Sequence, residues 1–176
     1  SRGAGGVRIG AGVVEAAARR AGWSSWKKGE ARGHGVAFSR YKGFGAYCAV
    51  VAEVEGEADI CVRRLVIAVD VGEVVNPDGV ENQMEGGAIQ AASWTLKEHV
   101  GYDRQRITTR SWADYPILTF PEVPAVEVHL INRPAERSLG TGEGSQGPTV
   151  AAISNAVAHA AGTRIRSSAS RVKWDR

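Results

Sequence analysis

The 176-residue chain has little of several features that would assign it to other classes of protein. No apolar run approaches the roughly 20 residues that a membrane span needs, and no signal-peptide pattern opens the chain, so we expect a soluble protein. Two cysteines are too few for an iron–sulfur cluster, which takes about four thiolates, and their spacing matches no zinc motif. Both Cys48 and Cys61 lie in apolar runs, which favours buried free thiols in a reducing compartment.

Strong charge and metal-ligand spacing are also lacking. The net charge is only +3, and the basic C-terminal stretch "RIRSSASRVKWDR" has no interleaved aromatics for base stacking, so we expect a solvated chain end and no nucleic-acid partner. His34, His99, His129 and His159 are scattered without the spacing of a metal pair. We therefore expect structural or surface histidines and no protein-ligated metal. The opening "SRGAGG" resembles a frayed or processed end.

The length fits one ordinary domain with its own hydrophobic core. Apolar residues at helical spacing predict a helix over 11–22, which ends at Gly22. The polar stretch 23–35 shows no regular period and is predicted to be a linker. Strand-like runs over 46–56 and 60–72 are joined by a short acidic turn, which predicts a β-hairpin.

Helix-start chemistry follows the hairpin directly. Asn76 can cap a helix and Pro77 suits its first position, which predicts a helix over 77–97. Alternation after several prolines predicts a strand over 126–131, and a run of small residues predicts a helix over 149–162. Because strands and helices mix without regular βαβ alternation, the predicted fold class is α+β.

The helix predicted over 77–97 contains two adjacent glycines, each of which costs roughly 1 kcal/mol relative to alanine. Helical spacing puts Gln83, Gly86, Gly87, Gln90 and Trp94 on one face. Something must therefore approach this face closely. The pattern leaves two interpretations open: a tight crossing with another helix, or a large polar ligand.

A second glycine-rich segment, "GTGEGSQGP", contains a nucleotide-binding pattern that lacks the context such a motif needs. Gly142, Gly144 and Gly147 spell the G-x-G-x-x-G pattern of dinucleotide-binding folds. That pattern needs a strand directly before it and an acidic residue about 20 positions later, and both are missing here. Ser145 in the same segment lacks the G-x-S-x-G context of a serine hydrolase. The sequence thus argues against both classes.

The carboxylate of Glu143 is the other feature of this segment. Small neighbours leave it open, and it precedes a predicted helix N-terminus, where backbone amides and the helix dipole favour an anion. An accessible general base fits this setting. A glutamate that only complements the helix dipole fits it as well, and spacing alone does not separate these two roles.

Two stretches carry a resemblance to a known family. "AVDVGEVVNPDGVENQMEGGAIQAASWTLKE" and "LGTGEGSQGPTVAAISNAVAHAAGTRIR" resemble the strand, N-P turn, Q-x-E-G-G helix and G-x-G-E loop of xanthine dehydrogenase-family large subunits. The stretch "ARGHGVAFSRYKGFGAYCAVVAEVE" resembles the strand region before them. These motifs are most similar to those of bacterial molybdopterin-binding subunits of the isoquinoline oxidoreductase and nicotinate dehydrogenase type, and the resemblance covers residues 30–166.

This resemblance implies roles for individual residues. Glu143 corresponds to the glutamate that acts as general base in hydroxylation by water. Gln83 corresponds to the glutamine that hydrogen-bonds the molybdenum cofactor, implied here in its cytosine dinucleotide form. Gly142, Gly86 and Gly87 would let that bulky cofactor approach both backbones. One departure is Gly144, which stands where many members carry proline or alanine.

The chain is several times shorter than such subunits, so the resemblance implies a C-terminal portion: a fragment, a processed chain or a split-gene product. We expect an N-terminal helix and linker over 1–29 and the cofactor-binding portion over 30–176. The implied partners are the rest of the large subunit, a subunit with iron–sulfur clusters, and an N-heteroaromatic or aldehyde substrate. The implied compartment is the cytoplasm, or the periplasm for an exported complex. The alternative is a non-catalytic structural or binding remnant.

Overall fold

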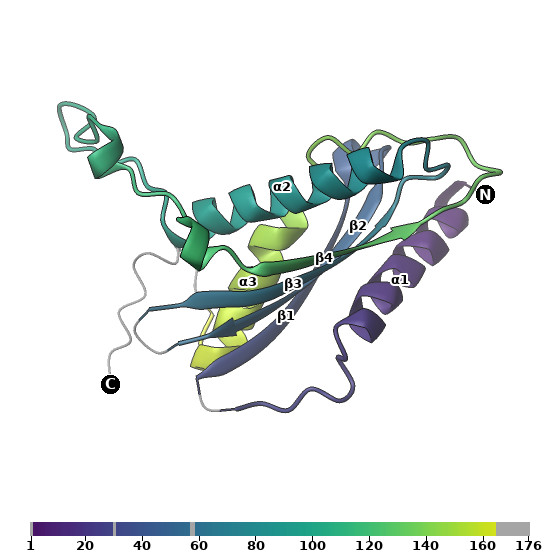
Figure 1. Ribbon diagram of the computed structural model, residues 1–176, viewed down its shortest axis with the longest axis horizontal. Coiled ribbons are helices and arrows are strands. Elements are labelled where there is room, and N and C mark those ends of the chain that lie inside the picture. Colours follow the sequence, from purple (N-terminus) through teal and green to yellow (C-terminus); the bar gives the residue numbers. More distant parts are fainter. Residues whose placement is uncertain (1, 30, 57–58, 165–176) are drawn as a thin grey trace.

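The computed structural model describes residues 2–29, 31–56 and 59–164. They form a four-stranded sheet with helices on both faces (Figure 1). The bounds of the longer elements are α1 (Arg2–Arg20), β1 (Arg32–Arg40), β2 (Tyr47–Glu55), β3 (Cys61–Asp70), α2 (Pro77–Leu96), β4 (Ala125–Ile131) and α3 (Gln146–Ala161). Short 3₁₀ turns are η1 (Tyr41–Gly43), η2 (Trp112–Asp114) and η3 (Phe120–Glu122).

The sheet is mixed. The strand order is β1-β2-β3-β4, with antiparallel pairing from β1 to β3 and parallel pairing between β3 and β4. A parallel pair needs a crossover connection, and α2 together with the segment after it provides one. The α+β prediction is confirmed, and so is the predicted hairpin of β2 and β3.

Strand β2 lies in the middle of the core. Cys48, Val50 and Ala52 pack with α2 and α3 on one face, while Ala49 and Val51 pack with α1 on the other. A strand covered on both faces reads as a continuous apolar run, as this one does. Burial raises the pKa of the Cys48 thiol to about 12, so this cysteine is an inert core residue, as predicted.

The predicted linker over 23–35 is partly wrong, because β1 already begins at Arg32. Its alternation is hidden in the sequence since Gly33 and Gly35 stand at the positions that face α3. A Cβ at Gly33 would lie 1.9 Å from the Ala156 carbonyl oxygen, and one at Gly35 would lie 2.3 Å from the Ala152 carbonyl oxygen. Helix α3 therefore packs directly on the backbone of β1, and only glycine permits that contact.

Helix α1 begins at Arg2 and not at residue 11, so it is longer than the apolar spacing predicted. Its early glycines reduce helix propensity but let the helix lie close to aromatic rings of the sheet. A Cβ at Gly10 would lie 3.0 Å from the Phe38 ring, and one at Gly6 would lie 3.2 Å from the Tyr47 hydroxyl. Tertiary packing thus extends the helix through residues that propensity alone disfavours.

Helix α2 matches its prediction within one residue at its C-terminal end. The Asn76 side chain accepts a hydrogen bond of 3.0 Å from the Gly79 amide, and Pro77 occupies the first helical position. Helix α3 ends where Gly162 adopts a left-handed conformation with φ of 72°, as the C-terminal glycine predicted. Local capping chemistry therefore sets both of these ends.

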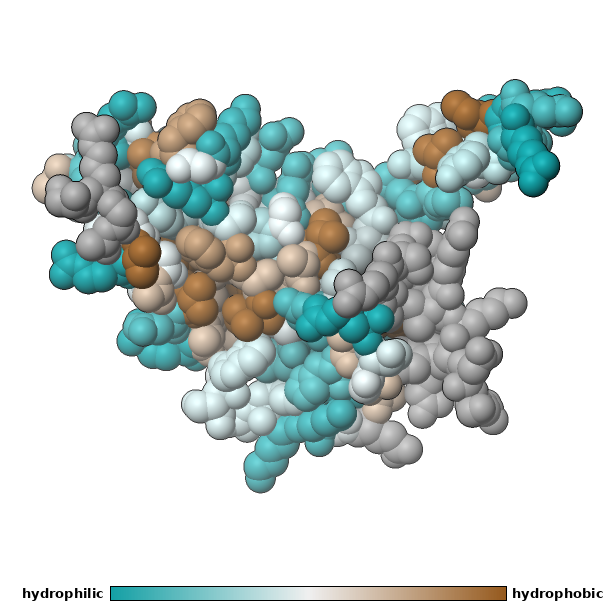
Figure 2. All heavy atoms as spheres, turned by 180° about the vertical axis from the view of Figure 1, so that it is seen from behind, coloured by the Kyte–Doolittle hydropathy of each residue, from teal (hydrophilic) through white to brown (hydrophobic). Residues whose placement is uncertain are grey.

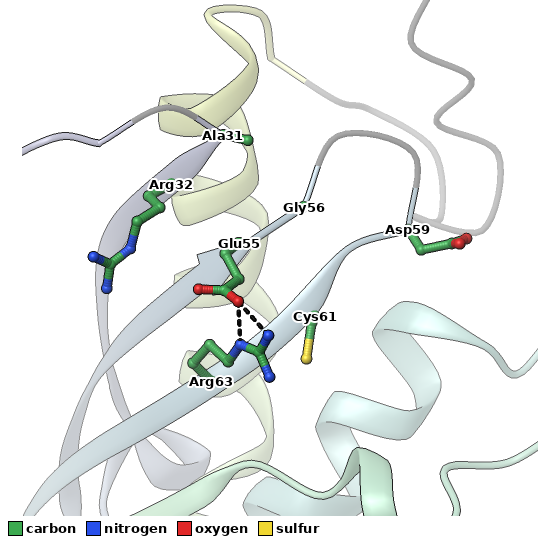
Figure 3. Close-up of a pocket in the computed structure, with 7 residues that line it drawn as sticks. All are labelled: Ala31, Arg32, Glu55, Gly56, Asp59, Cys61 and Arg63. Atoms are coloured by element: carbon green, nitrogen blue, oxygen red, sulfur yellow. Dashed lines mark hydrogen bonds and ion pairs between the residues drawn. The ribbon is translucent and has the colours of Figure 1, made fainter.

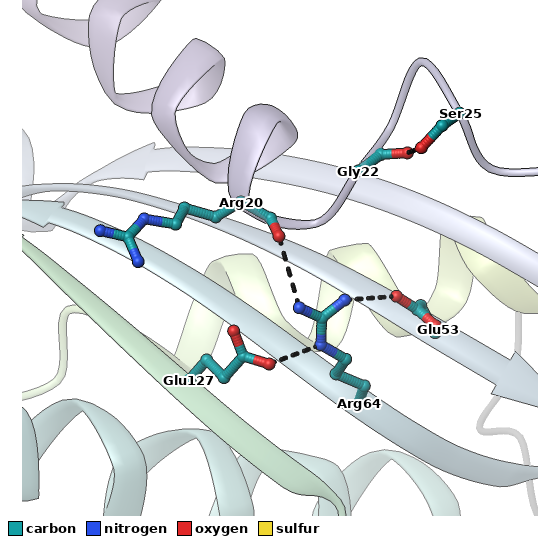
Figure 4. A network of polar contacts seen from close by, with 6 residues as sticks. All are labelled: Arg20, Gly22, Ser25, Glu53, Arg64 and Glu127. Carbon is teal, nitrogen blue, oxygen red and sulfur yellow. Dashed lines mark hydrogen bonds and ion pairs between the residues drawn. The ribbon is translucent and has the colours of Figure 1, made fainter.

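A single arginine joins three strands and the end of α1 (Figure 4). The Arg64 guanidinium donates to Glu127 at 2.7 Å, to Glu53 at 3.0 Å and to the Arg20 carbonyl oxygen at 3.3 Å. Its hydrogen bond lowers the pKa of the Glu127 carboxyl. This contact therefore stabilises the fold at neutral pH and is lost as the pH falls through that lowered pKa.

Candidate functional site

Residues 139–145, here called the Glu143 loop, lie between α2 and the connection from β1 to β2. The Ala46 amide donates to the Gly140 carbonyl oxygen at 3.0 Å, and the Leu139 amide donates to the Val71 carbonyl oxygen at 2.7 Å. Segments far apart in sequence thus hold the start of the loop from both sides. Residues 142–145 then form a turn that leads directly into α3.

An ion pair fixes the path by which the chain reaches this loop. Asp70, which is buried at the end of β3, accepts hydrogen bonds of 2.7 and 3.0 Å from Arg133 and one of 2.9 Å from the Gly72 amide. The bidentate contact raises the pKa of Arg133. Both charges are satisfied, so the irregular segment after β4 starts from a fixed point.

The carboxylate of Glu143 is exposed and precedes α3, as the sequence predicted. Its Oε2 accepts a hydrogen bond of 3.2 Å from the Tyr41 hydroxyl. Among the described residues, no backbone amide of α3 donates to this carboxylate, and α3 has no side-chain cap. This geometry favours an available carboxylate over one that only caps the helix.

Two glutamines of α2 attach that helix to the loop and to α3. The Gln83 amide nitrogen donates to the Gly142 carbonyl oxygen at 2.5 Å, and the Gln146 amide nitrogen donates to Gln90 at 3.0 Å. Gln83 keeps its carbonyl oxygen as an acceptor, and Gln90 keeps its two amide protons as donors. Both side chains are exposed, so these groups can still bind a polar ligand.

The paired glycines of α2 differ in what they face. Gly87 is buried, and a Cβ there would lie 2.6 Å from the Ser145 Oγ, which donates at 2.9 Å to the Met84 carbonyl oxygen. A Cβ at Gly86 would meet nothing within 4 Å. The tight-crossing interpretation therefore explains Gly87, while Gly86 faces open space beside Gln83 and Gln90.

Alanine substitutions at these two positions should have opposite effects on stability. Gly86→Ala is expected to raise the free energy of unfolding by about 0.5–1 kcal/mol through helix propensity. Gly87→Ala should instead lower it by roughly 1–2 kcal/mol, because the buried Ser145 hydroxyl would have to leave its hydrogen bond. Denaturant unfolding of the two variants checks this, and equal shifts would contradict the crossing geometry.

Sequence reasoning missed Tyr41, which lies at the start of η1 and is brought to Glu143 only by the fold. The only sequence signal was its place in the strand region that carries the family resemblance. Ser145 was discounted as a nucleophile, and the structure agrees because the side chain is fully buried and donates to a backbone oxygen.

The histidines do not form a metal site. His159 on α3 places its Nδ1 3.3 Å from the His34 amide nitrogen and 3.1 Å from the His34 carbonyl oxygen, and Trp23 stacks on the His34 ring at 4.4 Å. Within residues 2–29, 31–56 and 59–164, no three His, Cys, Asp or Glu side chains could hold a metal ion. No helix in this part of the chain is long and apolar enough to cross a membrane.

The surface has two hollows of interest. One, of about 280 Å³, lies beside Gln83 between the first turns of α2, the end of β3 and residues 138–141. The other, of about 330 Å³, lies at the opposite end of β2 and β3 (Figure 3). It includes the half-buried Cys61, so the expectation of a buried thiol is only partly met there, and its Arg63 pairs with Glu55. Only the first hollow adjoins the Glu143 loop.

Residues 10–124 match the molybdopterin cofactor-binding domain family, and the chain belongs to that family. It is 40% identical over 171 residues to a nicotinate dehydrogenase subunit of Pseudomonas putida, in a match that covers 88% of this chain and 14% of that protein. It is 35% identical over 163 residues to the beta chain of isoquinoline 1-oxidoreductase from Brevundimonas diminuta, with 90% and 20% covered.

The fold is similar to that of quinoline 2-oxidoreductase from Pseudomonas putida 86, with a TM-score of 0.62 and 31% identity. That match covers 66% of this chain and 16% of the other. The predicted family resemblance is confirmed. The chain spans about a seventh of the nicotinate dehydrogenase subunit and a fifth of the isoquinoline enzyme subunit.

The site's own geometry fits a bulky polar cofactor. The absent side chain of Gly86 leaves open space, and the exposed amides of Gln83 and Gln90 border it. The loop carbonyl of Gly142 is held in place by Gln83. These are the groups that a large ligand with many hydrogen-bonding atoms needs on one side.

Proposed function

We propose that this chain supplies the general base and one wall of the cofactor site of a molybdenum hydroxylase. The observation that carries the proposal is the exposed Glu143 carboxylate, fixed by Tyr41 on a loop that Gln83 joins to α2. The proposed reaction hydroxylates an N-heteroaromatic or aldehyde carbon with water. Support for N-heteroaromatic substrates comes from the names of two relatives, a nicotinate dehydrogenase and an isoquinoline oxidoreductase.

In this proposal a bound molybdenum cofactor supplies the redox centre that accepts the electrons of the substrate. Glu143 accepts the proton that water must lose, on a carboxylate oriented by the Tyr41 hydroxyl. Gln83, Gly86 and Gly142 would lie against the cofactor, and Gly87 gives that wall its shape by admitting Ser145. The proposed cofactor form is the cytosine dinucleotide.

The proposed partners are the rest of the large subunit and an iron–sulfur subunit. Two cysteines cannot hold such a cluster on this chain, so the electrons must leave through another one. Residues 30–176 are the portion proposed to adjoin the cofactor. The competing hypothesis is a non-catalytic remnant, which is compatible with the short span of the chain relative to both relatives.

The isolated chain is expected not to retain the cofactor. Among the described residues, one face of α2, the Glu143 loop and Tyr41 adjoin the proposed site, so most of a dinucleotide and its phosphates would have no partner groups. Intact mass and molybdenum content, measured on native material and on the recombinant chain, check this. Co-purifying large and iron–sulfur chains with metal would support the enzyme; a native 18.7 kDa monomer without metal would support the remnant.

A further inference from the structure

Residues 99–120, here called the arm, leave the end of α2, project from the body and return at η3. Figure 1 shows the arm, in green at the upper left, extending well beyond the sheet and its covering helices. It lies within the region that matches the family, so it is part of the domain. A projecting segment of this length must obtain its order locally or from a partner.

The arm has a defined backbone of its own. Tyr102 and Ile107 form an antiparallel bridge, and the turn between them is closed by Asp103. The Asp103 carboxylate accepts hydrogen bonds of 2.8 Å from the Gln105 amide and 2.9 Å from the Arg106 amide. These bonds fix the tip without the help of a hydrophobic core.

Leu118 of the arm packs against the core, but most of the other large apolar side chains of the arm are left exposed. Trp112 is 81% exposed, Phe120 96% and Tyr102 77%. The other exposed large hydrophobic residues of the arm are Val100, Ile107 and Ile117. Figure 2 shows brown, apolar residues on the arm beside teal, polar ones at its tip. Apolar groups concentrated on a projecting segment mark a surface that another protein covers.

The charges of the arm are unbalanced as well. Arg104, Arg106 and Arg110 are exposed, and none of the ion pairs among the described residues includes them. The arm also carries two carboxylates, Asp103 and Asp114, which accept hydrogen bonds from arm backbone amides, so its guanidinium groups exceed its carboxylates by one. The surface therefore offers aromatic rings together with guanidinium groups that make no ion pair among the described residues, the residue types that dominate binding energy at interfaces.

We infer that the arm docks onto the remaining part of the large subunit, in an apolar groove flanked by carboxylates. The three arm rings could bury about 450–750 Å², a large share of the roughly 800 Å² per partner in a stable interface. The relatives of this chain carry a remainder several times its own size, which supplies such a partner. The identity of the partner rests on the proposed function.

A second copy of the chain is a poorer occupant. A symmetric dimer places the same patch on both sides of the interface. Arm-to-arm contact would then place two arms of the same net positive charge against each other, and like net charges weaken association. Charge thus favours a different, acidic surface.

Photo-crosslinking in the native assembly tests which surface covers the arm. A photoreactive phenylalanine analogue at Trp112 is expected to crosslink to large-subunit peptides outside this chain. The same analogue at Val7, which is 73% exposed on α1, serves as the control and should give at least tenfold less of that product. Crosslinks between two copies, equal yields at both positions, or no crosslink at Trp112 would each overturn the inference.

Charge reversal provides the second measurement. The double substitution Arg104→Glu and Arg106→Glu should raise the dissociation constant of the assembly at least tenfold. Mass photometry on serial dilution measures this change. The matched control is Lys27→Glu with Lys28→Glu, an exposed pair in the segment before β1, which should change assembly less than twofold. Equal effects of the two pairs would contradict docking through the arm. Circular dichroism confirms that each variant is folded.

Neither measurement uses turnover, so the two proposals can fail separately. An assembly that forms through the arm but does not hydroxylate would remove the catalytic proposal and leave docking. An active assembly without arm crosslinks would remove docking alone.

Discussion

Replacing Glu143 with glutamine in the assembled enzyme is expected to lower turnover per molybdenum by about 10²–10⁴-fold, the usual cost of losing a general base. Glutamine has nearly the same shape, and its carbonyl oxygen can still accept the hydrogen bond from Tyr41. The loop should therefore keep its geometry while the proton acceptor disappears. Steady-state rates, with molybdenum measured on the same samples, give the result.

The control for this substitution is Glu81→Gln, a similar change at an exposed position of α2 away from the loop, which should leave turnover unchanged. If Glu143 only complemented the dipole of α3, its replacement would cost about 0.3–1 kcal/mol of stability and little activity. Near-normal turnover per molybdenum in Glu143→Gln would therefore exclude Glu143 as the base.

Alanine at Gly35 should destabilise the chain by about 3 kcal/mol, the upper end of the usual cost of overpacking. The added Cβ would lie 2.3 Å from both the Ala152 carbonyl oxygen and the Ala156 amide nitrogen. These are backbone atoms of a regular helix, so no rotamer change can relieve the clash. Helix α3 would have to move away from β1. Denaturant unfolding measures the loss.

Gly12→Ala is the matched control, because a Cβ at that exposed position of α1 would meet nothing within 4 Å. It should stabilise the chain by about 0.5–1 kcal/mol through helix propensity. If Gly35→Ala were as stable as the parent chain, direct packing of α3 on β1 would be wrong. Since the Glu143 loop leads into α3, a real shift of that helix should also lower turnover in the assembled enzyme.

Two pairs of glycines, Gly86 with Gly87 and Gly33 with Gly35, show what local sequence patterns can and cannot predict. Sequence spacing placed Gly86 and Gly87 on one helical face, yet it could not tell that Ser145 fills the space at Gly87 while Gly86 stays open. At Gly33 and Gly35 the same kind of contact concealed a strand, because residues without side chains show no alternation. A close contact between two backbones depends on the tertiary structure. A glycine in the sequence indicates that such a contact exists, but it does not identify the residue that makes the contact.

The sequence by itself determined the hairpin, the bounds of α2, the end of α3, the position of Glu143 before a helix, and the family. The family follows from the resemblance of three sequence stretches. The other features follow from capping residues, turn residues and the spacing of apolar side chains, all of which act within a few positions. Only the tertiary structure decided that Tyr41 meets Glu143, that Gln83 holds the Gly142 carbonyl, and that the arm stands uncovered. These contacts join residues far apart in the chain, and their partners depend on how the helices pack on the sheet.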